Sequence, residues 1–198
     1  MDTDNKKMGH DNYEKGLELE LRFCAFMKSD LGYREAAIRR HMKTKVANNA
    51  IEVDIIGERI NDAGRVLLIL CGIYLTGFAI LFCIGIYNSD DDMLLGGLIA
   101  EFAGITALLL SLKYNIENAW VECKNKGKDK VNLEQVRKSI DNNRDYKDTG
   151  DKEFKFNRHY FVSASGFVDD AYHYAKEKGV TCYIEKNGTF VEATYWNI

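Results

Sequence analysis

The chain has 198 residues, of which 46% are hydrophobic and 29% are charged, and its formal net charge is −3. This length fits one medium-sized domain, or one domain with an appendage. Five cysteines, an odd number, favour a reducing compartment over a disulfide framework. The first 60 residues are highly charged and hold no early apolar core, so we expect no secretory signal.

The N-terminal part predicts a helix and then a strand. Asp11–Leu31 has the pattern of a helix, with Gly32 in the position that commonly follows a helix end. The basic stretch 34–45 gives no clear assignment. Ile51–Ile56 is dense in isoleucine and valine and predicts a strand.

Two long apolar segments follow this strand. Val66–Tyr87 contains no charged residue, and Met93–Leu112 contains only Glu101. As helices, each would cover roughly 30 Å, the thickness of bilayer hydrocarbon. Buried core helices are the alternative, but these are usually shorter and carry a polar stripe. We therefore predict a transmembrane helical hairpin with spans at 66–87 and 93–112.

The hairpin divides a single domain. We expect residues 1–64 and 114–198 to form its two parts, with the hairpin at 65–113 between them. Arg65 and Lys113 flank the open ends of the hairpin, whereas the connecting loop holds three aspartates and no lysine or arginine. The positive-inside rule then predicts a two-span protein of the cell inner membrane with both termini in the cytoplasm.

Small residues recur in the second span. Gly96, Ala100 and Gly104 follow one another at every fourth position, a spacing that allows close helix packing. Glu101 lies near the predicted midplane, where a carboxyl group favours a contact with another helix. Together these residues predict a homo-oligomer.

The sequence after the hairpin alternates between strands and helices, which is typical of an α/β domain with a mixed sheet flanked by helices. Strands are predicted at 119–123, 159–164, 180–185 and near 189–195, and helices at 131–146 and 168–178. The last two strands are joined by Asn187-Gly188, a strong hairpin signal.

Three residues in the strands beside the hairpin have the chemistry of a metal-dependent site. Asp54 interrupts an apolar strand, and Glu122 and Lys124 are two apart and so share a strand face. Converging carboxylates supply the oxygen ligands that Mg²⁺ prefers. A lysine beside them can orient an attacking water while the metal stabilises charge on a phosphate. With residues 65–113 set aside, Asp54 and Glu122 are 19 positions apart, the scale of one connection between strands.

This pattern resembles the PD-(D/E)XK nuclease superfamily, and in particular the Mrr-like restriction endonucleases. The resemblance implies a restriction-endonuclease-like fold in which Asp54 and Glu122 bind Mg²⁺ or Mn²⁺ and Lys124 is catalytic. It rests on Gly16-Leu17-Glu18-Leu19-Glu20, Leu31-Gly32-Tyr33, Val53-Asp54-Ile55-Ile56-Gly57, Val121-Glu122-Cys123-Lys124, Ser165-Gly166-Phe167, and Ala171 with Ala175.

The resemblance also implies a catalytic glutamate in the first helix, which would be Glu20 or Glu18. Helical periodicity favours Glu20, because apolar residues follow it at the inward-facing positions, whereas Glu18 shares its side with Arg22. The helix from Gly16 to Gly32 is one residue longer than the commonest family spacing, which leaves both glutamates open.

Two basic stretches beside these residues are predicted to contact DNA phosphates. The alternatives are a solvated loop and attraction to anionic lipid headgroups. The residues concerned are Arg39, Arg40, Lys43, Lys126 and Lys128.

We therefore expect a membrane-anchored, Mg²⁺-dependent endonuclease that hydrolyses DNA phosphodiester bonds on the cytoplasmic side, in defence against foreign DNA. The alternative is a catalytically inactive membrane adaptor, or an oligomerising hairpin protein, that binds nucleic acid. In that case Asp54, Glu122 and Lys124 would form an ordinary buried ion-pair cluster.

Overall fold

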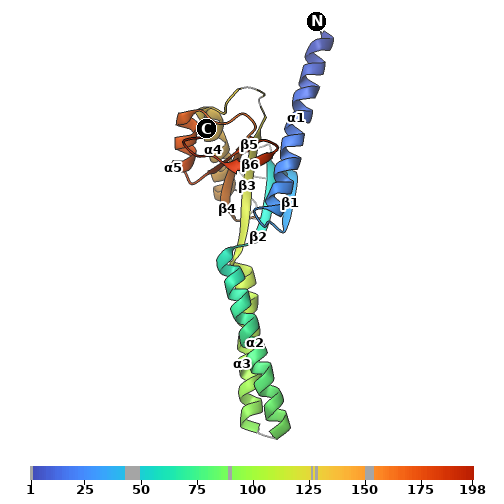
Figure 1. Cartoon of the computed structure of the whole chain (residues 1–198), viewed down its shortest axis with the longest axis vertical. Coiled ribbons are helices and arrows are strands. Elements are labelled where there is room, and N and C mark those ends of the chain that lie inside the picture. The colour runs from blue at the N-terminus through green and yellow to red at the C-terminus, as the bar shows by residue number, and fades with distance from the viewer. Residues whose placement is uncertain (1, 43–49, 89–90, 126, 128, 150–153) are drawn as a thin grey trace. The chain divides into compact units, whose positions relative to one another are not determined.

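The structure, a computed structural model, describes residues 2–42, 50–88, 91–125, 127, 129–149 and 154–198. It divides into two compact units, one formed by residues 1–59 with 118–198 and the other by residues 60–117. The first is an α/β unit and the second is a pair of helices (Figure 1).

A mixed six-stranded sheet forms the centre of the α/β unit, as the sequence predicted. β1 pairs antiparallel with β2, and β5 with β6, whereas β3, β4 and β5 run parallel. β2 and β3 are hydrogen-bonded neighbours although 55 residues separate them in the chain. The strands lie in chain order: β1 (Glu35–Met42), β2 (Ile51–Ile60), β3 (Ile116–Lys124), β4 (Phe156–Ser163), β5 (Thr181–Lys186) and β6 (Thr189–Glu192).

Helices cover both faces of this sheet (Figure 1). On one face, α1 (Asp2–Ser29) buries Phe23 and Met27 against the strands. On the other, α4 (Leu133–Thr149) and α5 (Asp169–Glu177) complete the core. Because side chains alternate along a strand, neighbouring residues serve different faces. Val121 of β3 packs under α1, and Trp120 packs against Tyr146 of α4.

Two elements differ from the sequence prediction. β1 lies in the basic stretch 34–45. That stretch had no assignment because this edge strand exposes Arg40 and His41 and so lacks a clear apolar alternation. α1 begins at Asp2, earlier than the predicted start at Asp11. The prediction missed the first turns because they are almost entirely polar and show no apolar periodicity. The other elements agree with the prediction to within four residues at either end.

The second unit is an antiparallel pair of helices, α2 (Asp62–Asn88) and α3 (Asp91–Tyr114). Glycines allow the two helices to approach closely. A Cβ atom placed on Gly104 would lie 2.6 Å from Leu75 Cδ2, and one on Gly97 would lie 3.2 Å from Phe82 Cβ.

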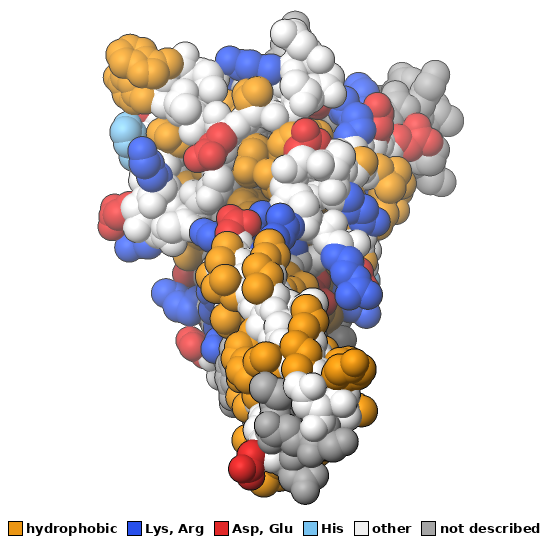
Figure 2. Space-filling view, turned by 60° about the horizontal axis from the view of Figure 1, so that its bottom comes forward, with side chains coloured by type: hydrophobic (Ala, Val, Ile, Leu, Met, Phe, Trp, Pro, Cys, Tyr) orange, Lys and Arg blue, Asp and Glu red, His pale blue; other side chains and the backbone are white. Residues whose placement is uncertain are grey.

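The surface of this unit is strongly apolar. Figure 2 shows hydrophobic side chains gathered over it, and single residues such as Ile73 and Phe102 are 65% and 76% exposed. Of the helices in the described parts of the chain, α2 is long and apolar enough to cross a membrane, whereas the apolar part of α3, Leu94–Leu110, is shorter. One of the two predicted spans therefore meets the length criterion.

Candidate functional site

Asp54 lies in the middle of β2, where the strand is irregular. Val53 packs in the core under α4, whereas Ile55, two residues further on, packs under α1. Ile38 of β1 pairs with Ile55, and Arg40 pairs with Val53, so Arg39 lies opposite Asp54. Arg39 has a φ of +51°. The backbone N–H of Cys123 donates a hydrogen bond of 2.7 Å to Asp54 Oδ2. This bond fixes the carboxylate against β3.

Glu122 and Lys124 of β3 flank Cys123 and share one strand face. Lys124 Nζ donates a hydrogen bond of 2.5 Å to Glu122 Oε1. Both side chains are mostly buried, with exposed fractions of 14% for Glu122 and 31% for Lys124. The structure thus brings Asp54, Glu122 and Lys124 together on two neighbouring strands.

The charges in this cluster shift two pKa values. Burial raises the pKa of Asp54 to about 7, and repulsion from Glu122 adds to the rise, against the opposing effects of the Cys123 N–H and Lys124. Burial lowers the pKa of Lys124, but the charge of Glu122 and its hydrogen bond outweigh this, so that the pKa lies above its ordinary value. Lys124 is therefore a cation at neutral pH, and Asp54 keeps its proton to a higher pH than an ordinary aspartate does.

The cluster fits a hard divalent cation. The carboxylates of Asp54 and Glu122 repel each other in a buried site, and a cation between them would remove that repulsion. Mg²⁺ is commonly bound by one or two carboxylates and keeps several of its waters. Within the described residues, no group of three or more His, Cys, Asp or Glu side chains could hold a metal.

Glu20 is the buried member of the two first-helix candidates, as periodicity favoured. It is 6% exposed, whereas the Glu18 side chain is 67% exposed and lies 3.8 Å from Arg22. Arg39 donates hydrogen bonds of 2.8 and 3.0 Å to the two carboxylate oxygens of Glu20, and these bonds raise the pKa of the Arg39 guanidinium. Glu20 also lies within electrostatic range of Asp54.

The residues predicted to contact DNA differ in their availability. Arg39 is held by Glu20, and its guanidinium lies 4.5 Å from the ring centroid of Tyr13. Arg40 is exposed, with its guanidinium 5.3 Å from the ring centroid of Phe154. Of the two arginines, Arg40 is therefore the more exposed to solvent. The remaining three predicted contacts lie outside the described residues: Lys43, Lys126 and Lys128.

Two contacts around the cluster were not predicted from the sequence. One is the contact of Tyr13 with Arg39. Tyr13 precedes Glu20 by seven residues and so shares its helix face, and this spacing could have indicated that Tyr13 lies beside the cluster. Asn125 Nδ2 donates a hydrogen bond of 2.9 Å to the Lys15 carbonyl and ties the end of β3 to α1. No local pattern points to this bond, because its two residues are 110 positions apart.

Comparisons with known proteins yield one weak structural likeness. No protein-family model matches the chain, and no curated protein matches it. A solved structure, that of a protein of unknown function designated AF1548, superposes with a TM-score of 0.47 at 12% sequence identity. The match covers 84% of this chain and 56% of that one, so the chain spans little more than half the length of AF1548.

Proposed function

We propose that this chain is a membrane-anchored endonuclease that uses Mg²⁺ or Mn²⁺ to hydrolyse DNA phosphodiester bonds at the cytoplasmic face of the inner membrane. One observation carries the proposal. Asp54, Glu122 and Lys124 meet on β2 and β3 although 67 residues lie between the aspartate and the glutamate. Their agreement with the Mrr-like pattern supports the choice of reaction.

Each residue of the cluster has a distinct role in this proposal. Asp54 and Glu122 would hold the divalent ion, which when bound stabilises negative charge on the phosphate. Lys124 stays protonated at neutral pH, so it orients the attacking water and offsets phosphate charge as a fixed cation. Asp54 would hold the ion in its ionised form, and the ion would offset the burial and the repulsion from Glu122 that raise the Asp54 pKa to about 7.

Glu20 contributes as a positioning residue. Its two hydrogen bonds from Arg39 hold β1 at the point where β2 is irregular. Since that irregularity lies at Asp54, the ion pair between α1 and β1 supports the orientation of the catalytic carboxylate. Arg40, exposed on the same strand, is the arginine that we assign to a contact with a DNA phosphate.

The membrane anchor is supported by the apolar surface of α2 and by its pairing with α3. Exposed apolar area costs about 25 cal/mol per Å² in water, and hydrocarbon removes that cost. An antiparallel hairpin returns the chain to the side it left, so we place both spans, 66–87 and 93–112, in the bilayer. Arg65 at the open end and the aspartates of the loop support a topology with both termini in the cytoplasm.

A homo-oligomer would use the part of the small-residue stripe that the hairpin leaves open. Gly104 is covered by Leu75 and Tyr74 of the same chain. A Cβ atom placed on Gly96 meets no described atom within 4 Å. Gly96 and Ala100 are therefore the positions we assign to a contact between chains.

Plasmid cleavage tests the proposed reaction. The full chain in detergent is incubated with supercoiled plasmid in Mg²⁺ or in EDTA, and nicked and linear products are measured. We expect cleavage in Mg²⁺ that EDTA abolishes and that Asp54→Ala removes. Glu52→Gln is the matched control, because Glu52 is an exposed acid on the same strand. Absence of cleavage of DNA and RNA with several metals would refute the proposal and favour the membrane adaptor. Full activity of Asp54→Ala would refute the assignment of the reaction to the Asp54 cluster.

A role in defence against foreign DNA follows from the proposed activity at the membrane. Cells that express the chain should lower plasmid transformation and phage plating relative to cells that express Lys124→Ala. Equal plating of the two would leave the defence role without support even if the purified chain cleaves DNA.

A further inference from the structure

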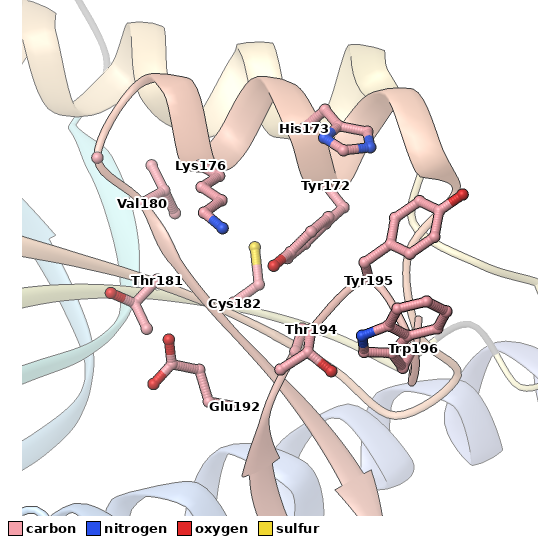
Figure 3. A pocket seen from close by; sticks show the side chains of 12 residues that line it. Tyr172, His173, Lys176, Val180, Thr181, Cys182, Glu192, Thr194, Tyr195 and Trp196 are labelled. Atoms are coloured by element: carbon pink, nitrogen blue, oxygen red, sulfur yellow. The ribbon is translucent and has the colours of Figure 1, made fainter.

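A cavity of about 550 Å³ lies between α5, β5 and the segment that follows β6 (Figure 3). It shares no lining residue with the Asp54 cluster. Its volume is in the range typical of small-molecule sites. The cavity therefore needs an account separate from the proposed cleavage of DNA.

The floor of the cavity carries a polar group without a partner. Tyr172 is 7% exposed, and no hydrogen bond joins its hydroxyl to any described residue. Figure 3 shows this hydroxyl pointing into the cavity beside the Cys182 thiol. Burial, and next the charge of Glu192, raises the pKa of Cys182 to about 12, so the thiol is neutral. The hydroxyl is open to the cavity, so a ligand there can form a hydrogen bond with it.

Aromatic rings form one end of the cavity. Trp196 is 90% exposed and Tyr195 is 58% exposed, and their ring centroids are 5.3 Å apart in an edge-to-face arrangement. His173 continues the row, with its centroid 6.0 Å from that of Tyr195. So large an exposed indole on a cavity wall is suited to a flat ligand that stacks on it.

Opposite charges stand at the remaining wall. Lys176 and Glu192 line the cavity, both are exposed, and no ion pair involves either within the described part of the chain. A lysine ammonium binds one anionic group such as a phosphate. A carboxylate accepts hydrogen bonds from an amino group. The cavity is thus suited to a ligand that combines a flat ring, an exocyclic amino group and one negative charge.

We propose that this cavity binds the nucleobase and phosphate of a nucleotide unit. The base stacks on Trp196, its polar edge meets Tyr172 and Glu192, and the phosphate meets Lys176. Two sources share this chemistry, a free mononucleotide and an unpaired base of a single-stranded nucleic acid. The proposal goes beyond the endonuclease activity and uses none of its residues.

Binding to the full chain in detergent tests this proposal, with EDTA present so that no cleavage occurs. The probes are AMP, GMP, CMP, UMP and a ten-nucleotide single-stranded DNA of mixed sequence, measured by equilibrium dialysis. We expect Tyr172→Phe, which keeps the ring, to weaken binding about tenfold. Lys176→Met should weaken it as well, whereas Lys186→Met, an exposed lysine of β5 outside the cavity, should leave it unchanged. Trp196→Ala should weaken binding tenfold or more.

The probes also distinguish the two sources. Binding of a mononucleotide that these variants weaken supports a free nucleotide, and binding of the oligonucleotide alone supports a nucleic-acid strand. The proposal is overturned if no probe binds at millimolar concentration, or if Tyr172→Phe and Trp196→Ala both bind as the unsubstituted chain does. Because no step depends on cleavage, failure here and failure of the nuclease proposal are separate results.

Discussion

The polar side chains of the Asp54 cluster are paired with one another, whereas those of the aromatic cavity in the same α/β unit are not. In the cluster, Lys124 bonds to Glu122, Arg39 bonds to Glu20, and the aspartate accepts a bond from a backbone N–H. In the cavity, the hydroxyl of the buried tyrosine, the lysine and the glutamate have no hydrogen-bond or ion-pair partner in the described residues. Groups that are already paired are ordered before a substrate arrives, whereas unpaired groups gain partners only when a ligand enters.

The two regions also differ in how the chain builds them. The cluster joins residues of α1, β1, β2 and β3, and these residues are spread from Tyr13 to Lys124. The cavity is made by one local stretch, residues 172–196. Substitutions in the cluster should therefore change stability and activity together, and substitutions at the cavity rim should change ligand binding alone.

The largest effect is expected at Lys124. Lys124→Met removes the fixed cation beside the two carboxylates and should lower the initial rate of plasmid nicking by roughly 100-fold or more, since charge stabilisation of this kind is worth several kcal/mol. Lys124→Arg keeps the charge and should retain part of the rate. Lys130→Met, at an exposed lysine beyond the strand, is the control. A Lys124→Met chain that cuts at the normal rate would make the cluster a structural ion pair only.

The affinity for Mg²⁺ should depend on pH. Because the ion competes with the proton that Asp54 holds, affinity should rise as the pH rises through about 7 and fall by up to tenfold per unit below it. Titration calorimetry at pH 6, 7 and 8 measures this, with Asp54→Asn as the control that should bind weakly at every pH. An affinity constant over this range would show that Asp54 does not bind the ion.

Asp54→Asn should stabilise the fold while it abolishes cleavage. The folded chain raises the pKa of Asp54 from 3.8 to about 7, so the folded state binds this proton more tightly than the unfolded state does. The wild-type chain therefore loses stability as the pH rises from about 4 through 7. Asparagine avoids that loss and can still accept the bond from the Cys123 N–H. We expect a gain of about 1–2 kcal/mol at pH 8 and little gain at pH 4, from thermal unfolding in detergent. A variant less stable than wild type at pH 8 would contradict this reading.

Local patterns predicted most elements of the fold, and the Mrr-like resemblance singled out the cluster. Asp54 and Glu122 could be linked only because the hairpin was recognised and set aside, which left one strand connection between them. The choice of Glu20 over Glu18 followed from periodicity, which reports the buried face of a helix directly. Nothing local predicted Arg39 as the partner of Glu20, because a positive φ in an edge strand leaves no sequence pattern.

The cavity was missed for a different reason. Aromatic residues such as Tyr172, Tyr195 and Trp196 are the usual material of a core, and the sequence gives no sign of which rings stay exposed. Strand β6 ends at Glu192, three residues before the predicted end near 195, so Tyr195 lies outside the sheet. The exposure of that segment follows from where the sheet stops, which depends on tertiary pairing.

The smallest effect is expected from Trp196→Ala, which tests whether the cavity rim belongs to the core. Trp196 is 90% exposed, and its substitution should change the free energy of unfolding by less than about 0.5 kcal/mol, as for other surface positions. Tryptophan fluorescence during unfolding measures this change directly. The variant retains one tryptophan, Trp120, which is fully buried between Tyr146 and Phe156. Its emission reports unfolding without interference from the rim. A loss above 1 kcal/mol would mean that the Trp196 ring stabilises the fold, and its exposure could then no longer be read as a surface kept open for a ligand.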